Sequence, residues 1–298
     1  MKKLITVLSL FVTLSPFVSA QEKVIPQGVG NTAMQFVCQP RTAAATAMAG
    51  IEAFDGADFF LRDTGRVELD VSYSMWERTA SVASSPVNAV IRYKSRNFIG
   101  VSVDMHVDRM KSTIPTDENG DFQRNGQYMP SNLGLGLGVD FLVLPNVEIA
   151  AKARYLRSNF YLGQNFNAFS SDLTAAAVFG SFGVVAGVAN LGPKVSGKYS
   201  LPTSALICAT FEHKGIMAEV EGDYYFFGGI RLAAAASYTF KDIVTARVGY
   251  NMGKGTPLES FASAGLGVKV VGIQLNLAYL FSNNPLNGTA SIGLNYKF

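Results

Sequence analysis

The chain has few charged residues, and beyond its first twenty residues it has no long apolar run. Only 16% of its 298 residues are charged, although 48% are hydrophobic. Ordinary soluble domains carry roughly 25% charged residues. No stretch of about 18 apolar residues follows the N-terminal segment, which excludes membrane-spanning helices. Apolar and polar residues are instead interleaved, as in a transmembrane β-barrel whose strands face lipid on one side and a polar lumen on the other.

Other scarce residues exclude further classes of protein. The two cysteines exclude a disulfide framework, and the apolar and aromatic content excludes a disordered chain. The net charge of +3 comes without a lysine- or arginine-rich run, so nucleic acid is not an expected partner.

Residues 1–20 predict an export signal. A basic pair at residues 2–3 precedes an apolar stretch over residues 4–14, and Val-Ser-Ala at residues 18–20 forms a small-residue cleavage site. We expect cleavage after Ala20, with an uncleaved anchor as the alternative. The sequence therefore predicts an exported protein of the cell outer membrane.

Residues 21–65 show no alternation and form a separate N-terminal segment. Within it, residues 41–50 read RTAAATAMAG, which is small and rich in alanine. The segment either plugs the barrel as a hatch or leads into it from the periplasm, and the sequence leaves both readings open. Export favours an oxidising compartment, in which Cys38 and Cys208 are able to pair if the fold brings them together.

Residues 66–298 alternate with the period of a β-strand. In the last segment Ile292, Leu294 and Tyr296 alternate with Gly293 and Asn295, so one set suits lipid and the other a lumen. We expect an all-β fold, a transmembrane antiparallel β-barrel of about fourteen strands. The strands are expected to begin near Arg66, Pro86, Asn97, Ser131, Val147, Ser171, Phe182, Pro202, Gly215, Gly229, Asp242, Ser260, Val271 and Leu286.

The connections between these segments alternate between short and long, as they do in outer-membrane barrels. An even strand number puts both ends of the barrel chain in the periplasm, which makes the short turns periplasmic and the long connections extracellular. Short turns are expected at 94–96, 144–146, 180–181, 213–215, 241–242 and 269–270, and long connections at 111–130, 159–170, 190–201, 253–259 and 282–287.

Charged residues fall on the predicted inward face. Asp104, His106 and Asp108 alternate on one strand, which fits either a metal or hydrolase site or one side of an internal salt-bridge network. The mixed signs of the other inward residues favour the network, because buried charges need partners. Together these residues are Asp104, His106, Asp108, Arg154, Glu219, Glu221 and Arg231.

Two further expectations follow from the same alternation. Gly134, Gly136 and Gly138 share the inward face, where they leave room in the lumen. Trp76 and several strand-end tyrosines are expected in the aromatic girdles at the membrane interfaces. With two histidines and no serine partner at a recognisable spacing, nucleophilic catalysis has no support. We expect neither enzymatic activity nor a metal or other cofactor.

Four short motifs, in order along the chain, resemble one family. They are Pro40–Gly50, Val71–Trp76 (VSYSMW), Ala153–Ser158 (ARYLRS) and Asn190–Lys194 (NLGPK), the last followed by Leu-Pro-Thr at residues 201–203. In these motifs the chain resembles the PorV/PorQ family, a branch of the FadL-like outer-membrane barrels associated with type IX secretion in Bacteroidetes.

The resemblance implies a cargo-shuttle or complex-adaptor protein of type IX secretion. Its partners would be outer-membrane lipid, the C-terminal domains of secreted cargo and other secretion components. The candidate binding loop comprises Asn190, Leu191, Gly192, Pro193, Lys194, Lys198 and Tyr199. The alternative reading of this segment is a loop that merely folds over the barrel mouth. The alternative function is a FadL-type transporter of hydrophobic small molecules, which needs an apolar pocket and a lateral opening.

Overall fold

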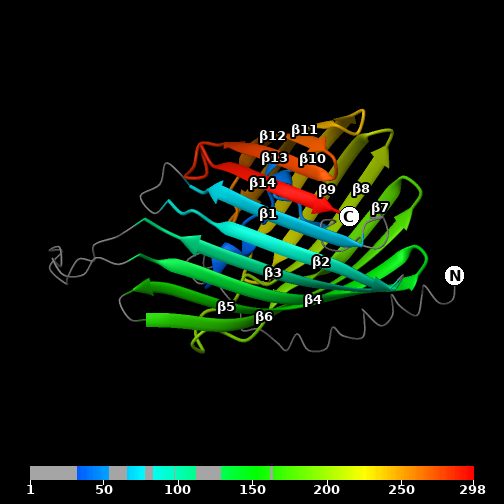
Figure 1. Cartoon of the computed structure of the whole chain (residues 1–298). Helices are drawn as coiled ribbons and strands as arrows, with labels where there is room; N and C mark the ends of the chain where they lie inside the picture. Colours follow the sequence, from blue (N-terminus) through cyan, green and yellow to red (C-terminus); the bar gives the residue numbers. More distant parts are fainter. Residues whose placement is uncertain (1–31, 54–65, 78–82, 97, 112–128, 162–163) are drawn as a thin grey trace.

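A closed antiparallel barrel forms the body of the molecule (Figure 1). The computed structural model describes residues 32–53, 66–77, 83–96, 98–111, 129–161 and 164–298. Within these residues the barrel has fourteen strands, as the alternation predicts. They are β1 Val67–Met75, β2 Val87–Arg96, β3 Ile99–Arg109, β4 Ser131–Leu144, β5 Val147–Tyr161, β6 Gln164–Phe179, β7 Phe182–Leu191, β8 Ser204–His213, β9 Ile216–Tyr225, β10 Ile230–Phe240, β11 Val244–Lys254, β12 Phe261–Val270, β13 Ile273–Phe281 and β14 Ala290–Lys297.

Each strand pairs with its neighbours in sequence, and β1 pairs with β14 to close the ring. The closing register places Asp70 opposite Asn295 and Ser74 opposite Ser291. Closure leaves no sheet edge, so every strand has two hydrogen-bonded neighbours. In the described part of the chain no helix has the length and apolarity needed to cross a membrane.

The predicted inward and outward faces are confirmed along most strands. In β13, Leu275, Leu277 and Tyr279 are exposed on the outer surface, whereas Ala278 and Leu280 are buried. The same alternation runs through β1, β3 and β14. The outer surface is therefore an apolar belt suited to lipid.

Trp76 is an exception, because it lies inside the barrel and not in an interfacial girdle. Its side chain is 3% exposed and belongs to an apolar cluster with Leu258, Phe261, Leu280 and Leu286. The reason is its position: on β1 the outward residues are Tyr73 and Met75, so the next residue in the alternation points inward.

The barrel has a turn end and a loop end. At the turn end, where even strands finish, short turns join β2 to β3, β4 to β5 and so on. At the loop end, where odd strands finish, the longer connections occur, although residues 112–128 of the β3–β4 connection lie outside the described residues. Short and long connections thus alternate as predicted, with one exception.

The exception is the connection between β5 and β6, which was expected to be long over residues 159–170. The strands instead continue to Tyr161 and restart at Gln164, so β6 begins well before Ser171. Polar residues at the start of β6 look like a loop in the sequence. In the structure Asn165 and Asn167 accept hydrogen bonds across the strand pair from Arg157 and Tyr155.

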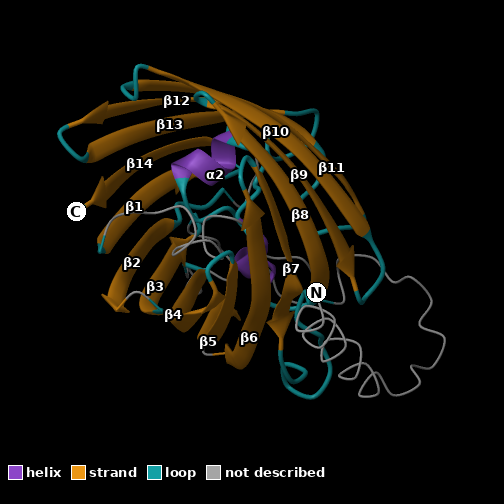
Figure 2. Ribbon diagram, turned by 90° about the vertical axis from the view of Figure 1, so that its right-hand side faces the viewer, coloured by secondary structure: helices purple, strands orange, loops and turns teal. Residues whose placement is uncertain are grey.

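Residues 32–53 lie inside the barrel (Figure 2). They include the short helices η3 Gln35–Cys38 and α2 Ala43–Ala47, and α2 contacts β1 and β11 to β14. Thr42 caps α2 by accepting a hydrogen bond from the Ala45 N–H at 2.9 Å. A helix of five residues is not stable alone, so packing against the wall must hold it. We call residues 32–53 the hatch.

Small residues allow the hatch to approach the wall closely. A Cβ built on Gly265 would lie 2.4 Å from the Ala47 Cβ, and one on Gly249 would lie 2.7 Å from the Ala49 backbone nitrogen. The alanines of the hatch therefore pack directly against the glycines of β11 and β12, and larger side chains on either surface would prevent this contact.

Candidate functional site

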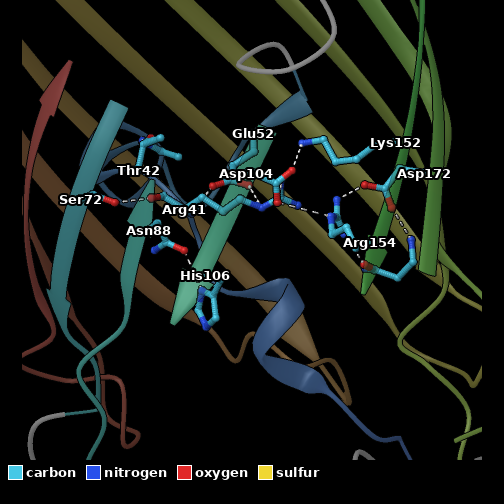
Figure 3. Close-up of polar contacts among 12 residues, drawn as sticks. Arg41, Thr42, Glu52, Ser72, Asn88, Asp104, His106, Lys152, Arg154 and Asp172 are labelled. Atoms are coloured by element: carbon cyan, nitrogen blue, oxygen red, sulfur yellow. Dashed lines mark hydrogen bonds and ion pairs between the residues drawn. The ribbon is translucent and has the colours of Figure 1, made fainter. Parts of the chain in front are cut away.

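The centre of the lumen holds a cluster of opposite charges (Figure 3). The carboxylate of Asp104 on β3 lies 3.0 Å from Lys152 Nζ and 4.0 Å from both Arg154 Nε and Arg41 Nη1. Arg154 also forms an ion pair with Asp172 on β6. Each charge has a partner, as burial requires.

Strand register brings this central cluster together. Asp104 pairs with Gly136 on β4, and Gly136 pairs with Arg154 on β5. Because Gly136 has no side chain, the Asp104 carboxylate and the Arg154 guanidinium reach toward each other over β4. This confirms the prediction that inward glycines leave room in the lumen.

The central cluster also binds the hatch to the wall. The Arg41 N–H donates to the Glu52 carboxylate, and the Arg41 carbonyl accepts a hydrogen bond from the Ser72 hydroxyl on β1. The Arg41 guanidinium faces Asp104 on the opposite side (Figure 3). Arg41 thus connects the hatch to both β1 and β3.

A second cluster surrounds Arg231 on β10. Its guanidinium forms ion pairs with Glu221 and Asp223, the latter at 2.7 Å, and donates to Asn251 Oδ1 at 2.7 Å. It also donates to the Ala49 carbonyl of the hatch at 2.9 Å. The inward charges therefore form one cluster at Asp104 and another at Arg231, and Glu68 pairs separately with Arg92 at 2.8 Å. Glu219 lies buried on the same face of β9 as Glu221.

Asp104, His106 and Asp108 are all buried on the inner face of β3, but each has different partners. His106 Nδ1 lies 2.7 Å from Asn88 Oδ1, and its ring stacks on Phe36 with a centroid distance of 5.0 Å. Asp108 accepts a hydrogen bond from Asn132. The structure does not bring the three side chains into one site. Among the described residues there is also no group of three metal-ligating side chains.

A large cavity opens at the loop end, between the hatch and the ends of the strands. Its volume is about 540 Å³. The lining is mostly apolar or uncharged, with aromatic side chains from the hatch, the wall and the β7–β8 loop. We call it the end cavity, lined by Thr32, Ala33, Met34, Gln35, Phe36, Gln39, Trp76, Glu77, Ser84, Met110, Asn132, Ser158, Phe166, Val195, Tyr199 and Pro257.

Below the end cavity the lumen narrows. Phe36, His106 and Leu156 are among the residues around a space of only about 20 Å³. Beyond this neck lies a polar cavity of about 170 Å³, whose lining includes Lys152 and Arg154. A space of the neck's size holds roughly one water molecule. It shares Phe36 and Gln39 with the end cavity, and Arg41 and Arg154 with the polar cavity.

A second hollow, of about 470 Å³, lies on the outer surface of the wall near the start of β2. Its lining includes the outward side chains Tyr73 and Met75. Trp76, Ser84 and Met110 line both this wall hollow and the end cavity. These three residues are therefore the partition between the interior and the outer surface.

The predicted binding loop between β7 and β8 divides into buried and exposed residues. Asn190 is 6% exposed, and its side chain accepts a hydrogen bond from Arg154 at 2.9 Å, so it faces the lumen and not an external partner. Its φ of +56° is a conformation that asparagine tolerates. The other residues of the predicted loop set, namely Leu191, Gly192, Pro193, Lys194, Lys198 and Tyr199, are exposed.

The loop is held down over the barrel mouth. Val195 and Leu201 are each 2% exposed and pack with Met34, Phe36 and Leu156. The hatch pairs with it as well, because the Ala33 N–H donates to the Ser200 carbonyl at 2.9 Å. The loop is therefore a fixed cover with exposed side chains on its outside.

The two cysteines are free thiols in the structure. Cys38 lines the central polar cavity, and burial raises the pKa of its thiol to about 12. Cys208 packs against the hatch residues Met48 and Ala49. The two thiols lie in different surroundings and do not pair, so this fold has no disulfide bond between Cys38 and Cys208.

No family model matches the sequence, and no curated protein is similar to it in sequence. Solved structures with the same fold do exist. A structure described as the TodX ΔS2S3 mutant monoaromatic hydrocarbon channel superposes with a TM-score of 0.58 at 11% identity, covering 86% of this chain and 99% of that one. The Pseudomonas putida toluene transporter TodX gives 0.57 at 11% identity, covering 86% and 96%.

A Pseudomonas aeruginosa FadL homologue gives a TM-score of 0.56 at 10% identity, covering 86% of this chain and 98% of that one. The molecule is thus an outer-membrane type of β-barrel, and within that class it has the FadL-like fold. The narrower PorV/PorQ resemblance finds no support among these structures and stays a prediction from the motifs.

Proposed function

We propose that this barrel lets small hydrophobic molecules cross the outer membrane through the end cavity and the wall beside it. The observation that carries the proposal is the partition of Trp76, Ser84 and Met110, which separates the end cavity from the wall hollow. Movement of these side chains would join a lumen pocket to the lipid-facing surface. The expected transporter needs such a pocket and such an opening.

The lumen itself offers a poor route for an apolar molecule. Around and beyond the neck lie the buried charges of Asp104, Lys152 and Arg154. An apolar molecule at this level would separate paired charges without replacing their interactions, which is costly. The wall hollow beside the end cavity combines the apolar side chains of Tyr73, Met75 and Met129 with Arg109 and Lys111. A molecule that leaves this way avoids the paired charges of the lumen, so lateral exit is the favoured direction.

The wall beside the partition lacks one backbone hydrogen bond. Ser84 and Trp76 exchange two backbone hydrogen bonds, of 3.0 and 3.1 Å, and Ser84 also bridges to Met110. Pro86 accepts a hydrogen bond from the Ser74 N–H at 3.0 Å but has no N–H to return. Opening this stretch would therefore break one backbone hydrogen bond fewer than opening a fully paired stretch of the same length.

The proteins of similar fold are named as a toluene transporter and a monoaromatic hydrocarbon channel, which agrees with this class of substrate.

An adaptor role in type IX secretion is the second candidate. It is favoured by the fixed loop that presents Lys194, Lys198 and Tyr199 outward. Under either proposal the chain acts by binding and passage, without catalysis.

A blocking substitution tests the transport proposal. Ser84→Phe places a ring in the partition, whereas Val87→Phe adds the same ring on the exposed outer face of β2, outside both cavities. Uptake of radiolabelled toluene by cells that depend on this protein should fall severalfold for Ser84→Phe and stay near normal for Val87→Phe. Equal uptake by both variants, with equal amounts of folded barrel, contradicts passage through this wall.

A further inference from the structure

Among the described residues that line the end cavity, Glu77 carries the only charge. It directly follows Trp76, with a left-handed φ of +49°. Its N–H donates to Thr289 Oγ1 at 3.0 Å, which fixes the backbone at this point. The cavity therefore combines an apolar, aromatic interior with one carboxylate on a fixed backbone.

Three side-chain donors around the cavity are already engaged. Asn132 Nδ2 donates to Asp108, and the Ser158 hydroxyl donates to Asn132 Oδ1 at 2.5 Å. Gln35 Nε2 donates to Thr32 Oγ1 at 2.9 Å. Stabilising a buried anion requires cations or available N–H and O–H groups. The described residues of the lining include no cation, and these three donors are committed elsewhere.

The cavity does have hydrogen-bond acceptors available to a bound molecule. Gln39 Oε1 is buried and has no hydrogen-bond partner among the described residues, so it can accept a hydrogen bond from a bound molecule. Glu77 is a further acceptor. Burial, together with the nearby carboxylates of Glu259 and Asp108, raises the pKa of Glu77. The same surroundings oppose any additional negative charge.

We propose that the end cavity selects uncharged ring molecules, with phenols and aromatic alcohols favoured, and rejects carboxylates. A hydroxyl group supplies the donor that the acceptors lack, whereas a carboxylate supplies only more negative charge. Glu77 is the residue that determines this selection. The inference rests on the proposed passage of hydrophobic molecules and narrows its substrate class.

The chain provides its own reporter for a test. Trp76 is the only tryptophan in the sequence, and it lines the end cavity. Ring compounds that carry bromine quench tryptophan fluorescence on contact. The purified full chain in detergent is therefore titrated at neutral pH with three probes of the same ring: para-bromotoluene, para-bromobenzyl alcohol and para-bromobenzoate.

We expect the alcohol to bind at least about tenfold more tightly than the benzoate, since one unfavourable charge contact is enough for such a ratio. In Glu77→Gln the benzoate should gain affinity and the ratio should shrink severalfold. The matched control is Glu212→Gln, an exposed residue at the turn end, which should leave the ratio unchanged.

The outcomes separate the two proposals. Equal affinities for alcohol and benzoate, or a ratio that Glu77→Gln does not alter, overturn the selection while leaving transport intact. Failure of both bromotoluene and the alcohol to quench Trp76 overturns the proposed function itself. If Glu77→Gln does not fold, as judged by heat-modifiable migration, the affinity ratio of the unsubstituted chain decides the matter.

Discussion

The carboxylate of Asp104 fills the space that a side chain on Gly136 would occupy. A Cβ built on Gly136 lies 2.3 Å from Asp104 Oδ1, which is far inside contact distance. Asp104 is 4% exposed and is the carboxylate around which Lys152 and Arg154 gather. The central charge cluster therefore depends on the absence of a side chain at Gly136 on the neighbouring strand β4.

This relationship predicts the effect of one methyl group. Gly136→Ala should displace the Asp104 carboxylate from its cations and lower the free energy of unfolding by about 1–3 kcal/mol, as overpacking usually does. The control is Gly134→Ala on the same face of β4, whose added Cβ meets nothing closer than 3.5 Å. Urea titration of heat-modifiable migration measures both. Equal stability of the two variants contradicts the packing argument.

The lipid-facing surface can be tested at the centre of β13. Leu277 is 46% exposed on the outer face, and Leu277→Arg should cost about 2–4 kcal/mol near the bilayer midplane. Gln274 on the same strand faces the lumen side, where Gln274→Arg should be milder. Folding into liposomes, measured by heat-modifiable migration, compares the two. A similar loss for both variants is incompatible with a membrane wall at β13.

Removing the cation of the second cluster should be strongly destabilising. Arg231→Gln leaves the buried carboxylates of Glu221 and Asp223 together without their cation, at a cost of about 3–5 kcal/mol. Arg157→Gln removes an exposed arginine whose guanidinium donates to Asn165 Oδ1, and should change stability little. The unfolding midpoint in urea distinguishes them. A stable Arg231→Gln barrel refutes the idea that this arginine neutralises the cluster.

Orientation in the membrane follows from the parity of connections. Lys198 lies in the exposed β7–β8 loop, and Lys214 lies in the turn between β8 and β9 at the opposite end. A membrane-impermeant maleimide should label Lys198→Cys on intact cells, and label Lys214→Cys only after lysis. The native cysteines are free, so Cys38 and Cys208 are first replaced by alanine. The reverse pattern of labelling reverses the orientation.

The exposed side of the β7–β8 loop separates the two candidate functions. Replacing Lys194, Lys198 and Tyr199 together by alanine leaves the buried anchors Val195 and Leu201 in place, so the barrel should stay intact. Because Tyr199 lines the end cavity, we expect reduced uptake of hydrophobic substrate with normal delivery of protein to the cell surface. Lost surface delivery with normal uptake would favour the type IX adaptor instead.

Sequence reasoning reached the barrel because alternation has a direct structural cause. Each strand has two faces, so Leu294 and Asn295 must point to opposite sides once the strand forms. Inward glycines were found in the same way. Where composition departs from the alternation the prediction failed: Asn165 and Asn167 read as loop residues, although Arg157 and Tyr155 bond to them across a strand pair.

The site was less accessible to sequence reasoning for a different reason. The end cavity is bounded by the hatch, the β7–β8 loop and the residues after β1, which are distant in sequence and lack a shared period. Glu77 follows Trp76 directly, yet its role depends on Asn132 and Ser158 being engaged elsewhere. Arg41 was missed because its partner Asp104 is known only once the hatch lies inside the barrel.

The anchors of the hatch impose an order on assembly. The segment is made before any strand, yet its carbonyl groups are bound by residues made much later: Ala49 by Arg231 on β10 and Ala47 by Ser263 on β12. These contacts span most of the chain, and such distant contacts form late in folding. The hatch is therefore synthesised before the strands, but its Ala47 and Ala49 anchors are among the last contacts to form. Until β10 and β12 join the wall, nothing in the described chain supplies these two bonds, and a barrel arrested before closure would leave its interior open.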